Sequence, residues 1–128
     1  MQEEREQSII LANWLRYNHY TFTHIANESG LPPHVAMLAA KKKKAMGVSK
    51  GVPDFMIVLK TKGLLFIEMK RLKGGRVSPE QVEWINSLNT IASVEAIVCC
   101  GAEDAINTVE AYETKKTEPK KLTTITNN

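Results

Sequence analysis

Two apolar segments separated by a short polar turn constrain the fold of this chain more than any other feature. Residues 52–59 are nearly continuous in apolar character, which is typical of a strand buried on both faces of a sheet. The polar residues 60–63 then lead directly into a second apolar segment at 64–70, so the two segments are predicted to form a β-hairpin. A hairpin of this kind needs cover on both faces, and we therefore expect helices on either side of the sheet.

The sequence after the hairpin predicts a crossover that returns to the same sheet. Residues 78–81 carry a serine cap, a proline in the first turn and a glutamine three positions after the serine, which indicates the start of a helix. This helix should end near Thr90, and a buried strand is expected at 94–100. A helical crossover makes the strands on either side of it parallel. A last helix is predicted at 102–112.

Before the hairpin, the sequence predicts a helix, a strand and a second helix. The first helix has an apolar stripe that extends backward through Gln7 and Glu3. The residues of the stripe are Ile10, Leu11, Trp14 and Leu15. Alternating β-branched and aromatic residues at 20–25 indicate a strand, and a helix is expected from about 34 to 46, with Gly47 placed to end it. The complete order predicts an α/β fold with a mixed central sheet flanked by helices.

Length and composition indicate one globular domain. The chain has 128 residues, 43% hydrophobic and 24% charged, which suffices for a hydrophobic core. We expect this domain to cover residues 1–113, and the polar, aperiodic residues 114–128 to form a disordered tail.

Several features of the sequence predict a cytoplasmic location. No apolar run approaches the roughly 20 residues that span a bilayer, and the polar, acidic amino terminus is not typical of a secretory signal. The neighbouring Cys99 and Cys100 lie in an apolar segment and are predicted to be buried, reduced thiols. No membrane partner is expected.

Positive charge is unevenly distributed along the chain, although the net charge is only +3. Two basic groups stand out, and they consist of Lys41, Lys42, Lys43, Lys44 and Lys50, and of Lys70, Arg71, Lys73 and Arg76. Such an arrangement suits contact with a polyanion. A run of lysines on a solvated helix face gives the same pattern, so charge alone leaves the partner open.

Three ionisable residues interrupt the apolar hairpin. Asp54 opens the first strand, and Glu68 and Lys70 lie two residues apart in the second, so that their side chains share one face. The turn at 60–63 places Asp54 and Glu68 at similar depths in the hairpin. Burying these charges costs several kcal/mol unless a partner compensates. An ion pair at the end of a sheet is one explanation, and a divalent cation held by carboxylate oxygens, Mg²⁺ or Mn²⁺, is the other.

Five segments surround or contain this set in a fixed order: residues 24–28, 44–47, 51–54, 66–70, and 78–81 leading to Trp84. Together they resemble the VRR-NUC family of the PD-(D/E)xK nuclease superfamily. The likeness extends from about Glu3 to Tyr112. It implies a restriction-endonuclease-like core in the order helix, three strands, helix, strand, which agrees with the elements predicted above.

The resemblance also implies roles for the residues of the hairpin. Asp54 and Glu68, with the main-chain carbonyl of Met69, would hold Mg²⁺ or Mn²⁺, and Lys70 would assist the attacking water. Gln81 matches a glutamine that lies near the active site in the family, and its position in the capping sequence equally explains it as a helix cap.

A glutamate on the first helix completes the set that the resemblance implies. Glu3 fits best because it precedes Gln7 by four residues and lies on the Trp14 stripe, while Glu4 and Glu6 remain alternatives. A histidine-centred metal nuclease fits less well, because the spacing of the histidines matches no known pattern, and His24 is expected in the core or on the sheet surface.

The sequence therefore predicts a metal-dependent endonuclease that hydrolyses DNA phosphodiester bonds. The basic residues other than Lys70 would contact the phosphate backbone, and branched DNA such as a Holliday junction is the expected substrate, because no separate recognition domain is present. Relatives of this architecture that resolve four-way junctions work as homodimers, so the resemblance implies a homodimer. The short chain also resembles nucleases carried by bacteriophages, which implies that the cytoplasm is that of a bacterial or phage-infected cell. The alternatives are a DNA- or junction-binding module without catalysis, in which Asp54, Glu68 and Lys70 form a structural cluster, and an RNA substrate.

Overall fold

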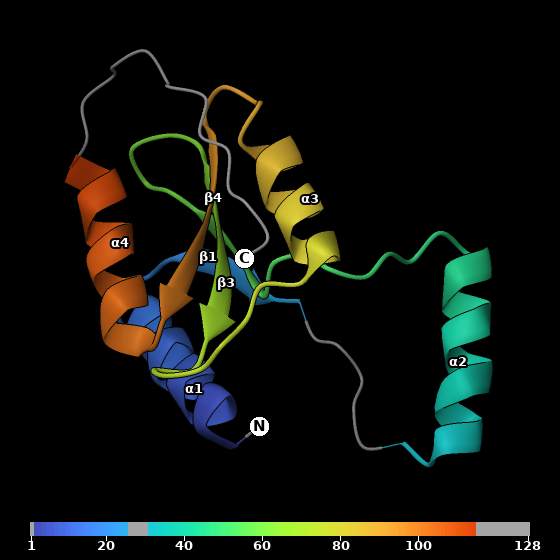
Figure 1. The fold of residues 1–128 in the computed structure, drawn as a ribbon. Helices are drawn as coiled ribbons and strands as arrows, with labels where there is room; N and C mark the ends of the chain where they lie inside the picture. The colour runs from blue at the N-terminus through green and yellow to red at the C-terminus, as the bar shows by residue number, and fades with distance from the viewer. Residues whose placement is uncertain (1, 26–30, 115–128) are drawn as a thin grey trace.

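The chain forms an α/β fold in which helices flank a four-stranded sheet (Figure 1). The computed structural model describes residues 2–25 and 31–114. Their helices are α1 (Gln2–Tyr17), α2 (Pro33–Ala45), α3 (Pro79–Leu88) and α4 (Ala102–Thr114). Their strands are β1 (Thr21–His24), β2 (Phe55–Val58), β3 (Leu64–Lys70) and β4 (Val94–Cys100). The predicted fold class and the order of elements are confirmed.

The sheet is mixed, with the strand order β1-β2-β3-β4. β2 pairs antiparallel with both β1 and β3, so the predicted hairpin is present. β3 and β4 are parallel and joined by α3, as the crossover argument predicted. Phe55 pairs with Ile67, and this register sets residue 54 opposite residue 68.

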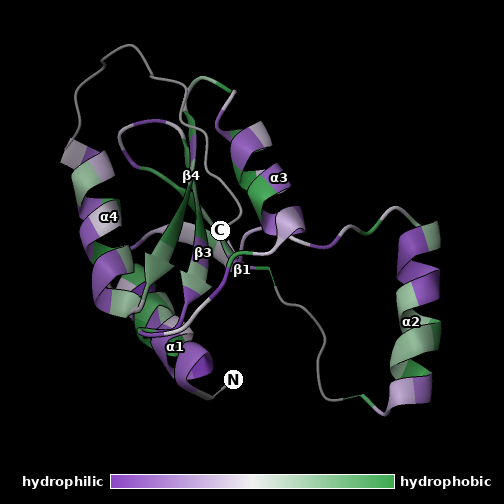
Figure 2. Ribbon diagram, in the orientation of Figure 1, coloured by the Kyte–Doolittle hydropathy of each residue, from purple (hydrophilic) through white to green (hydrophobic). Residues whose placement is uncertain are grey.

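The hydrophobic core lies between one face of the sheet and the helices α1 and α4, and α3 packs against β4 on the other face. Leu11 and Leu15 of α1 are completely buried against Leu65, Ile67 and other residues of the sheet. Ile10, which was predicted in the same stripe, is 49% exposed, because the centre of the buried face passes through Leu11 and Leu15. Figure 2 shows the strongly hydrophobic strands in the middle of these layers.

Strand β2 is shorter and less buried than its sequence predicted. The predicted strand covered residues 52–59, but β2 begins at Phe55 and Val58 is 42% exposed. α3 packs against β4 and contacts no residue of β2, so one face of β2 has no helix over it. The prediction of a strand buried on both faces was therefore wrong.

The two cysteines differ in burial. Cys99 is completely buried, whereas Cys100 is exposed, which corrects the prediction that both are buried. Successive side chains of a strand point to opposite faces, and Cys99 faces the core formed with α1 and α4.

Helix α2 extends away from the rest of the molecule (Figure 1). Among the described elements it contacts no other helix or strand, and none of its residues is buried. Gly47 follows it with φ +91°, as expected of a glycine that ends a helix. The apolar residues exposed on and beside α2 are Leu31, Val35, Met37, Leu38, Met46 and Val48.

The predicted tail begins inside the fold, because Thr114 is the last residue of α4. Residues 115–128 lie outside the described part of the chain, as do residues 26–30. Across the described residues, no helix combines the length and the apolar character needed to cross a membrane.

Candidate active site

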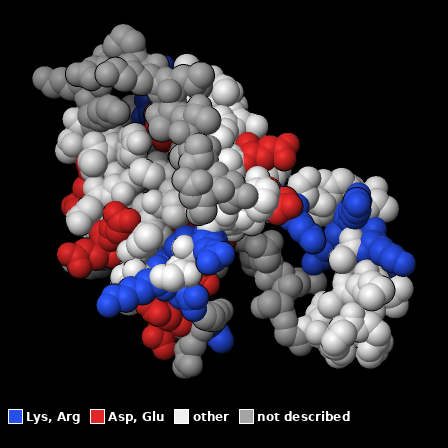
Figure 3. Space-filling view, viewed as in Figure 1, with Lys and Arg blue, Asp and Glu red and all other residues white. Residues whose placement is uncertain are grey.

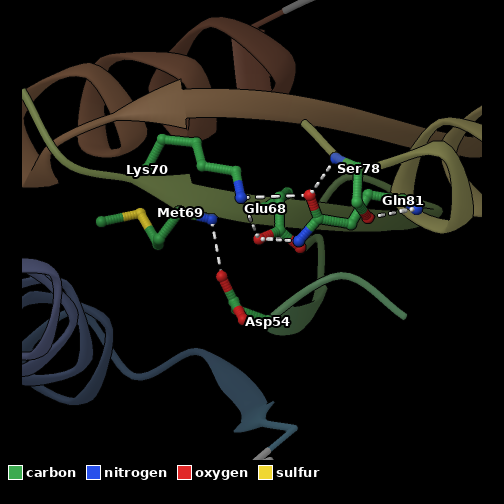
Figure 4. Close-up of polar contacts among 6 residues, drawn as sticks. All are labelled: Asp54, Glu68, Met69, Lys70, Ser78 and Gln81. Carbon is green, nitrogen blue, oxygen red and sulfur yellow. Dashed lines mark hydrogen bonds and ion pairs between the residues drawn. The ribbon is translucent and has the colours of Figure 1, made fainter. Parts of the chain in front are cut away.

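Asp54 lies immediately before β2, at the end of the sheet where β2 begins and β3 ends. Its Oδ2 accepts a hydrogen bond of 2.8 Å from the main-chain N–H of Met69, and its carbonyl oxygen accepts one of 2.6 Å from Ile25. The N–H and C=O of one residue in an antiparallel strand point to the same side. The Met69 carbonyl is therefore directed toward the side of β3 on which Asp54 lies, next to the start of β2. Figure 4 shows the Met69 N–H directed at the Asp54 carboxylate.

Glu68 is a buried carboxyl group with an unsatisfied oxygen. The residue is 3% exposed, and Oε2 accepts a hydrogen bond of 3.0 Å from Gln81 Nε2. Oε1 is buried and has no hydrogen-bond partner among the described residues. Burial, reinforced by the nearby Asp54 carboxylate, raises the pKa of Glu68 from 4.5 to about 8, and Lys70 only partly opposes this shift. The charge of Lys70 alone therefore does not compensate for the burial of the Glu68 carboxylate.

Lys70 and Gln81 complete a network around Glu68 (Figure 4). Lys70 Nζ lies 3.5 Å from Glu68 Oε2 and donates a hydrogen bond of 3.0 Å to Gln81 Oε1. The alternation along β3 accounts for the shared face of Glu68 and Lys70, and α3 lies over that face and supplies Gln81.

Gln81 is both a helix cap and a neighbour of the charged residues, so the two explanations from the sequence hold together. Ser78 Oγ accepts a hydrogen bond of 3.2 Å from Gln81 N, and Gln81 Oε1 accepts one of 2.9 Å from Ser78 N. Oε1 also faces the Lys70 ammonium, while Nε2 faces a carboxylate. A reversed amide would place donors against donors, so the surroundings fix its orientation.

Gly51 explains how the chain reaches Asp54. It has φ +91°, and a Cβ atom at this position would lie 2.5 Å from the carbonyl carbon of Glu80. The main chain before β2 therefore passes directly against the first turn of α3. Only glycine allows this approach, which sets the segment ending at Asp54 beside the helix that carries Gln81.

The glutamates of α1 differ in position. The exposed Glu3 accepts a hydrogen bond of 3.2 Å at Oε1 from the main-chain N–H of Leu72, and it does not line the cleft described below. Glu4 lines that cleft, together with Asp54 and Glu68. Glu6 is exposed and also outside the cleft. The structure thus brings Glu4, and not Glu3 or Glu6, to the surface that holds the two carboxyl groups.

In the described part of the chain, no three His, Cys, Asp or Glu side chains lie close enough together to hold a metal ion by themselves. Asp54 and Glu68 are the two carboxyl groups brought together with a main-chain carbonyl. Any ion at this site would therefore need water or substrate oxygens as further ligands.

The two predicted basic groups lie in different parts of the molecule (Figure 3). Lys41, Lys42, Lys43 and Lys44 are carried by the isolated α2, and the exposed Lys50 follows it. Arg71 and Arg76 line a hollow of about 380 Å³ beside Lys70, which Glu4 also lines. Lys73 is exposed in the loop between them. The second group therefore adjoins the candidate site, whereas the lysines of α2 do not.

A cleft of about 1250 Å³ leads to the candidate site. One wall comes from α1 and β1, and the floor holds Asp54, Glu68, Met69, Lys70 and Gln81. The wall contains three residues that the sequence did not single out as binding residues, Arg5, Arg16 and His24. The positions that α1 contributes are 4, 5, 8, 9, 12 and 16, which recur at the helical spacing of three to four, so this periodicity was the signal available in the sequence.

Comparison with known proteins identifies the family. A family model described as the VRR-NUC domain matches residues 1–103. A solved structure described as a "VRR_NUC domain protein" superposes with a TM-score of 0.61 and 26% sequence identity, and the match covers 86% of this chain and 87% of that chain. No curated protein matches the chain. Most of the chain and its fold agree with one family, and the protein belongs to the VRR-NUC family of nuclease-type domains.

Proposed function

We propose that this protein is a metal-dependent endonuclease that hydrolyses DNA phosphodiester bonds, with Asp54, Glu68 and Lys70 at the reacting centre. One observation carries the proposal: these three side chains, contributed by neighbouring parts of the hairpin, converge on the floor of one large cleft. VRR-NUC nucleases are generally metal-dependent, which supports a metal-assisted reaction.

The residues at this end of the sheet fit a hard divalent cation such as Mg²⁺ or Mn²⁺. The carboxylates of Asp54 and Glu68 and the carbonyl oxygen of Met69 would hold it, since such ions prefer oxygen ligands. The fit is supported by Glu68 Oε1, a buried oxygen without a partner in the described structure. When bound, the ion supplies Lewis-acid polarisation of the phosphoryl group and stabilises the leaving oxygen.

Lys70 supplies positive charge beside the scissile phosphate. Its ammonium is held by Gln81 Oε1 and Glu68 Oε2, at 3.0 and 3.5 Å, and its side chain is 12% exposed, so it is oriented but still reachable. From this position it donates a hydrogen bond to the attacking water or neutralises charge that develops on the phosphate. Gln81 bonds to both Lys70 and Glu68 and so holds their side chains in place, which makes it a positioning residue.

For the glutamate on the first helix, we propose Glu4 in place of Glu3. Glu4 faces the cleft and adjoins the hollow beside Lys70. Glu3 is engaged by the main chain at Leu72 and fastens the start of α1 to the loop after β3.

DNA with a branch is the proposed substrate, with phosphate contacts from both basic groups. Arg71, Lys73 and Arg76 adjoin the site and would contact phosphates near the cut, and the lysines of α2 and Lys50 would reach phosphates farther away. These contacts are independent of sequence, which suits recognition of DNA by its shape.

A homodimer is proposed as the working form. The apolar side chains of α2 are exposed, with Met37 and Leu38 each at 62%, and an isolated helix of this length is marginally stable in water. A second copy would cover them. Light scattering should give the mass of two chains, and the double variant Met37→Glu, Leu38→Glu should give the mass of one.

The nuclease activity is tested with purified protein, a four-way DNA junction, a linear DNA duplex and an RNA substrate, each in Mg²⁺, Mn²⁺ or EDTA. Cleavage that requires the metal and falls at least about 100-fold in Asp54→Ala and Lys70→Ala is expected. Both variants should retain DNA binding in EDTA. Binding without cleavage in every metal would instead favour a DNA-binding module, and cleavage of RNA alone would change the substrate.

A further inference from the structure

We propose that His24 is a stacking platform for an unpaired base of the DNA, next to the phosphate that is cut; this inference rests on the nuclease function proposed above. The His24 ring lies parallel to that of Phe55, with the ring centroids 4.6 Å apart and an interplanar angle of 5°. Phe55 is completely buried, whereas His24 is exposed and lines the cleft. One face of the imidazole ring is therefore covered by Phe55, and the exposed part of the side chain is left to contact a ligand in the cleft.

The platform is held firmly by the core. His24 is the direct partner of Phe55 in the pairing of β1 with β2. Phe22, two residues earlier on the same face, stacks on Phe55 at 6.4 Å. Because Phe55 is completely buried in the core, the surface on which the His24 ring lies is in place before any ligand binds. Such preorganisation lowers the cost of ordering a ligand against the ring.

The surroundings of His24 suit a strand of nucleic acid. Arg5 and Arg16 lie in the same wall of the cleft, and the Arg16 guanidinium group is 5.7 Å from the centre of the Phe22 ring. The wall thus combines an open aromatic face with positive charges for phosphates, the combination that binds single strands. At about 1250 Å³ the cleft exceeds the roughly 300–1,000 Å³ of small-molecule pockets.

The substrate class follows from what can reach an open ring face. A base within a duplex is covered by its neighbours on both sides, so only a base that is unpaired or at a branch can stack on His24. Asp54, Glu68 and Lys70 line the same cleft. The platform therefore selects DNA with an unpaired nucleotide beside the cut, such as a splayed arm or a flap, over a continuous duplex.

A fluorescent base tests this directly. A forked DNA with 2-aminopurine as its first unpaired nucleotide, and a duplex with 2-aminopurine inside it, are titrated with protein in EDTA, where no cleavage occurs. The variants are His24→Ala, which removes the platform, and His24→Phe, which keeps an aromatic ring. His34→Ala is the matched control, because His34 is an exposed histidine of α2 outside the cleft.

Wild type should quench the fork fluorescence and bind the fork more tightly than the duplex. Stacking on a base is worth about 1–3 kcal/mol, so His24→Ala should lower fork affinity about tenfold, within a range of roughly 5- to 150-fold. His24→Phe and His34→Ala should keep both the quenching and the preference. Equal quenching and an unchanged fork-to-duplex ratio in His24→Ala would overturn the proposal.

This result is separable from the nuclease proposal. Quenching and affinity are measured without catalysis, and a wild-type protein that stacks the base but cuts no DNA in Mg²⁺ or Mn²⁺ would refute the nuclease alone. A wild-type protein that cuts DNA without quenching the fork would refute the platform alone. If the melting curve shows that His24→Ala is unfolded, His24→Leu takes its place, because leucine fills the space over Phe55 without an aromatic face. Retained quenching by His24→Leu would then overturn the platform.

Discussion

Gln81 Nε2 donates a hydrogen bond of 3.0 Å to Glu68 Oε2, across the gap between α3 and β3. The same amide accepts from Lys70 Nζ and from the main chain at Ser78, so one side chain caps a helix and joins the two charged residues of the site. The helix therefore cannot shift relative to the strand without breaking the network. The residue that caps α3 therefore also holds Glu68 and Lys70 of the candidate site.

Substitutions of Gln81 should separate its two roles. Gln81→Ala leaves Ser78 N without its acceptor and removes the amide donor from Glu68 Oε2, which keeps only Lys70, and it should lower the free energy of unfolding by about 1–3 kcal/mol. Gln81→Glu keeps an acceptor for Ser78 N, since glutamate also serves in a capping box, but it sets a second carboxylate against Glu68. Its penalty should grow as the pH rises and Glu68 ionises. Urea unfolding at pH 5 and pH 8 measures both variants, and a pH-independent cost of Gln81→Glu would contradict this arrangement.

The buried Glu68 should make the metal-free protein less stable at high pH. Its pKa is raised from 4.5 to about 8 by burial and by Asp54. Between these values the folded state binds a proton that the unfolded state has lost, so the free energy of unfolding falls as the pH rises; below 4.5 both states are protonated and the penalty vanishes. Urea unfolding in EDTA across this range should show the decline, and Glu68→Gln, which cannot ionise, should flatten it.

Metal removal gives the complementary result for Glu68. Mg²⁺ or Mn²⁺ requires the ionised carboxylate, so stabilisation by the ion should increase with pH over the same interval. Melting temperatures with the ion and after chelation provide the measurement. An equal shift at pH 5 and pH 8, or the same shift in Glu68→Gln, would show that the ion binds elsewhere.

Two glycines with the same backbone angle allow a matched test of the contact between Gly51 and α3. Gly47 and Gly51 both have φ +91°, but a Cβ at Gly47 meets nothing within 4 Å, whereas one at Gly51 meets the main chain of Glu80 at 2.5 Å. Gly47→Ala should cost only the left-handed conformation, about 1–2 kcal/mol. Gly51→Ala adds a backbone clash and should cost about 2–5 kcal/mol. Equal losses on urea unfolding would mean that the approach to α3 adjusts freely.

The salt dependence of DNA binding distinguishes the two basic groups. Each phosphate contact adds about 0.9 to the slope of log K against log salt. Replacing Arg71, Lys73 and Arg76 together by glutamine should reduce the slope by about 3, and replacing Lys41, Lys42, Lys43 and Lys44 by about 3 to 4. Fluorescence anisotropy measures the DNA-binding constant at salt concentrations from about 50 to about 300 mM, and the slope of its logarithm is compared between the variants. A slope unchanged by one set assigns those side chains to solvent.

The sequence determined the local elements and their pairing. Alternation and the short turn at 60–63 specify the hairpin, and its register alone sets Asp54 opposite Glu68. The capping sequence defines the start of α3 and, through the crossover rule, the parallel pairing of β3 with β4. These features depend on residues close together in the chain, whose periodicity can be read directly.

Only the tertiary structure decided what depends on contacts between distant residues. The rotation of α1 is fixed by Gln7 accepting from Ala102 N at 2.7 Å and by Glu3 accepting from Leu72 N, and this rotation turns Glu4 and Arg5 toward the cleft. Helix packing likewise decides which surfaces stay uncovered. No helix covers the second face of β2, and α2 contacts no other described element. The His24 ring is covered by Phe55 on one side. A periodic pattern shows which residues of an element share a face, but the partner of that face is set by the packing of the whole chain.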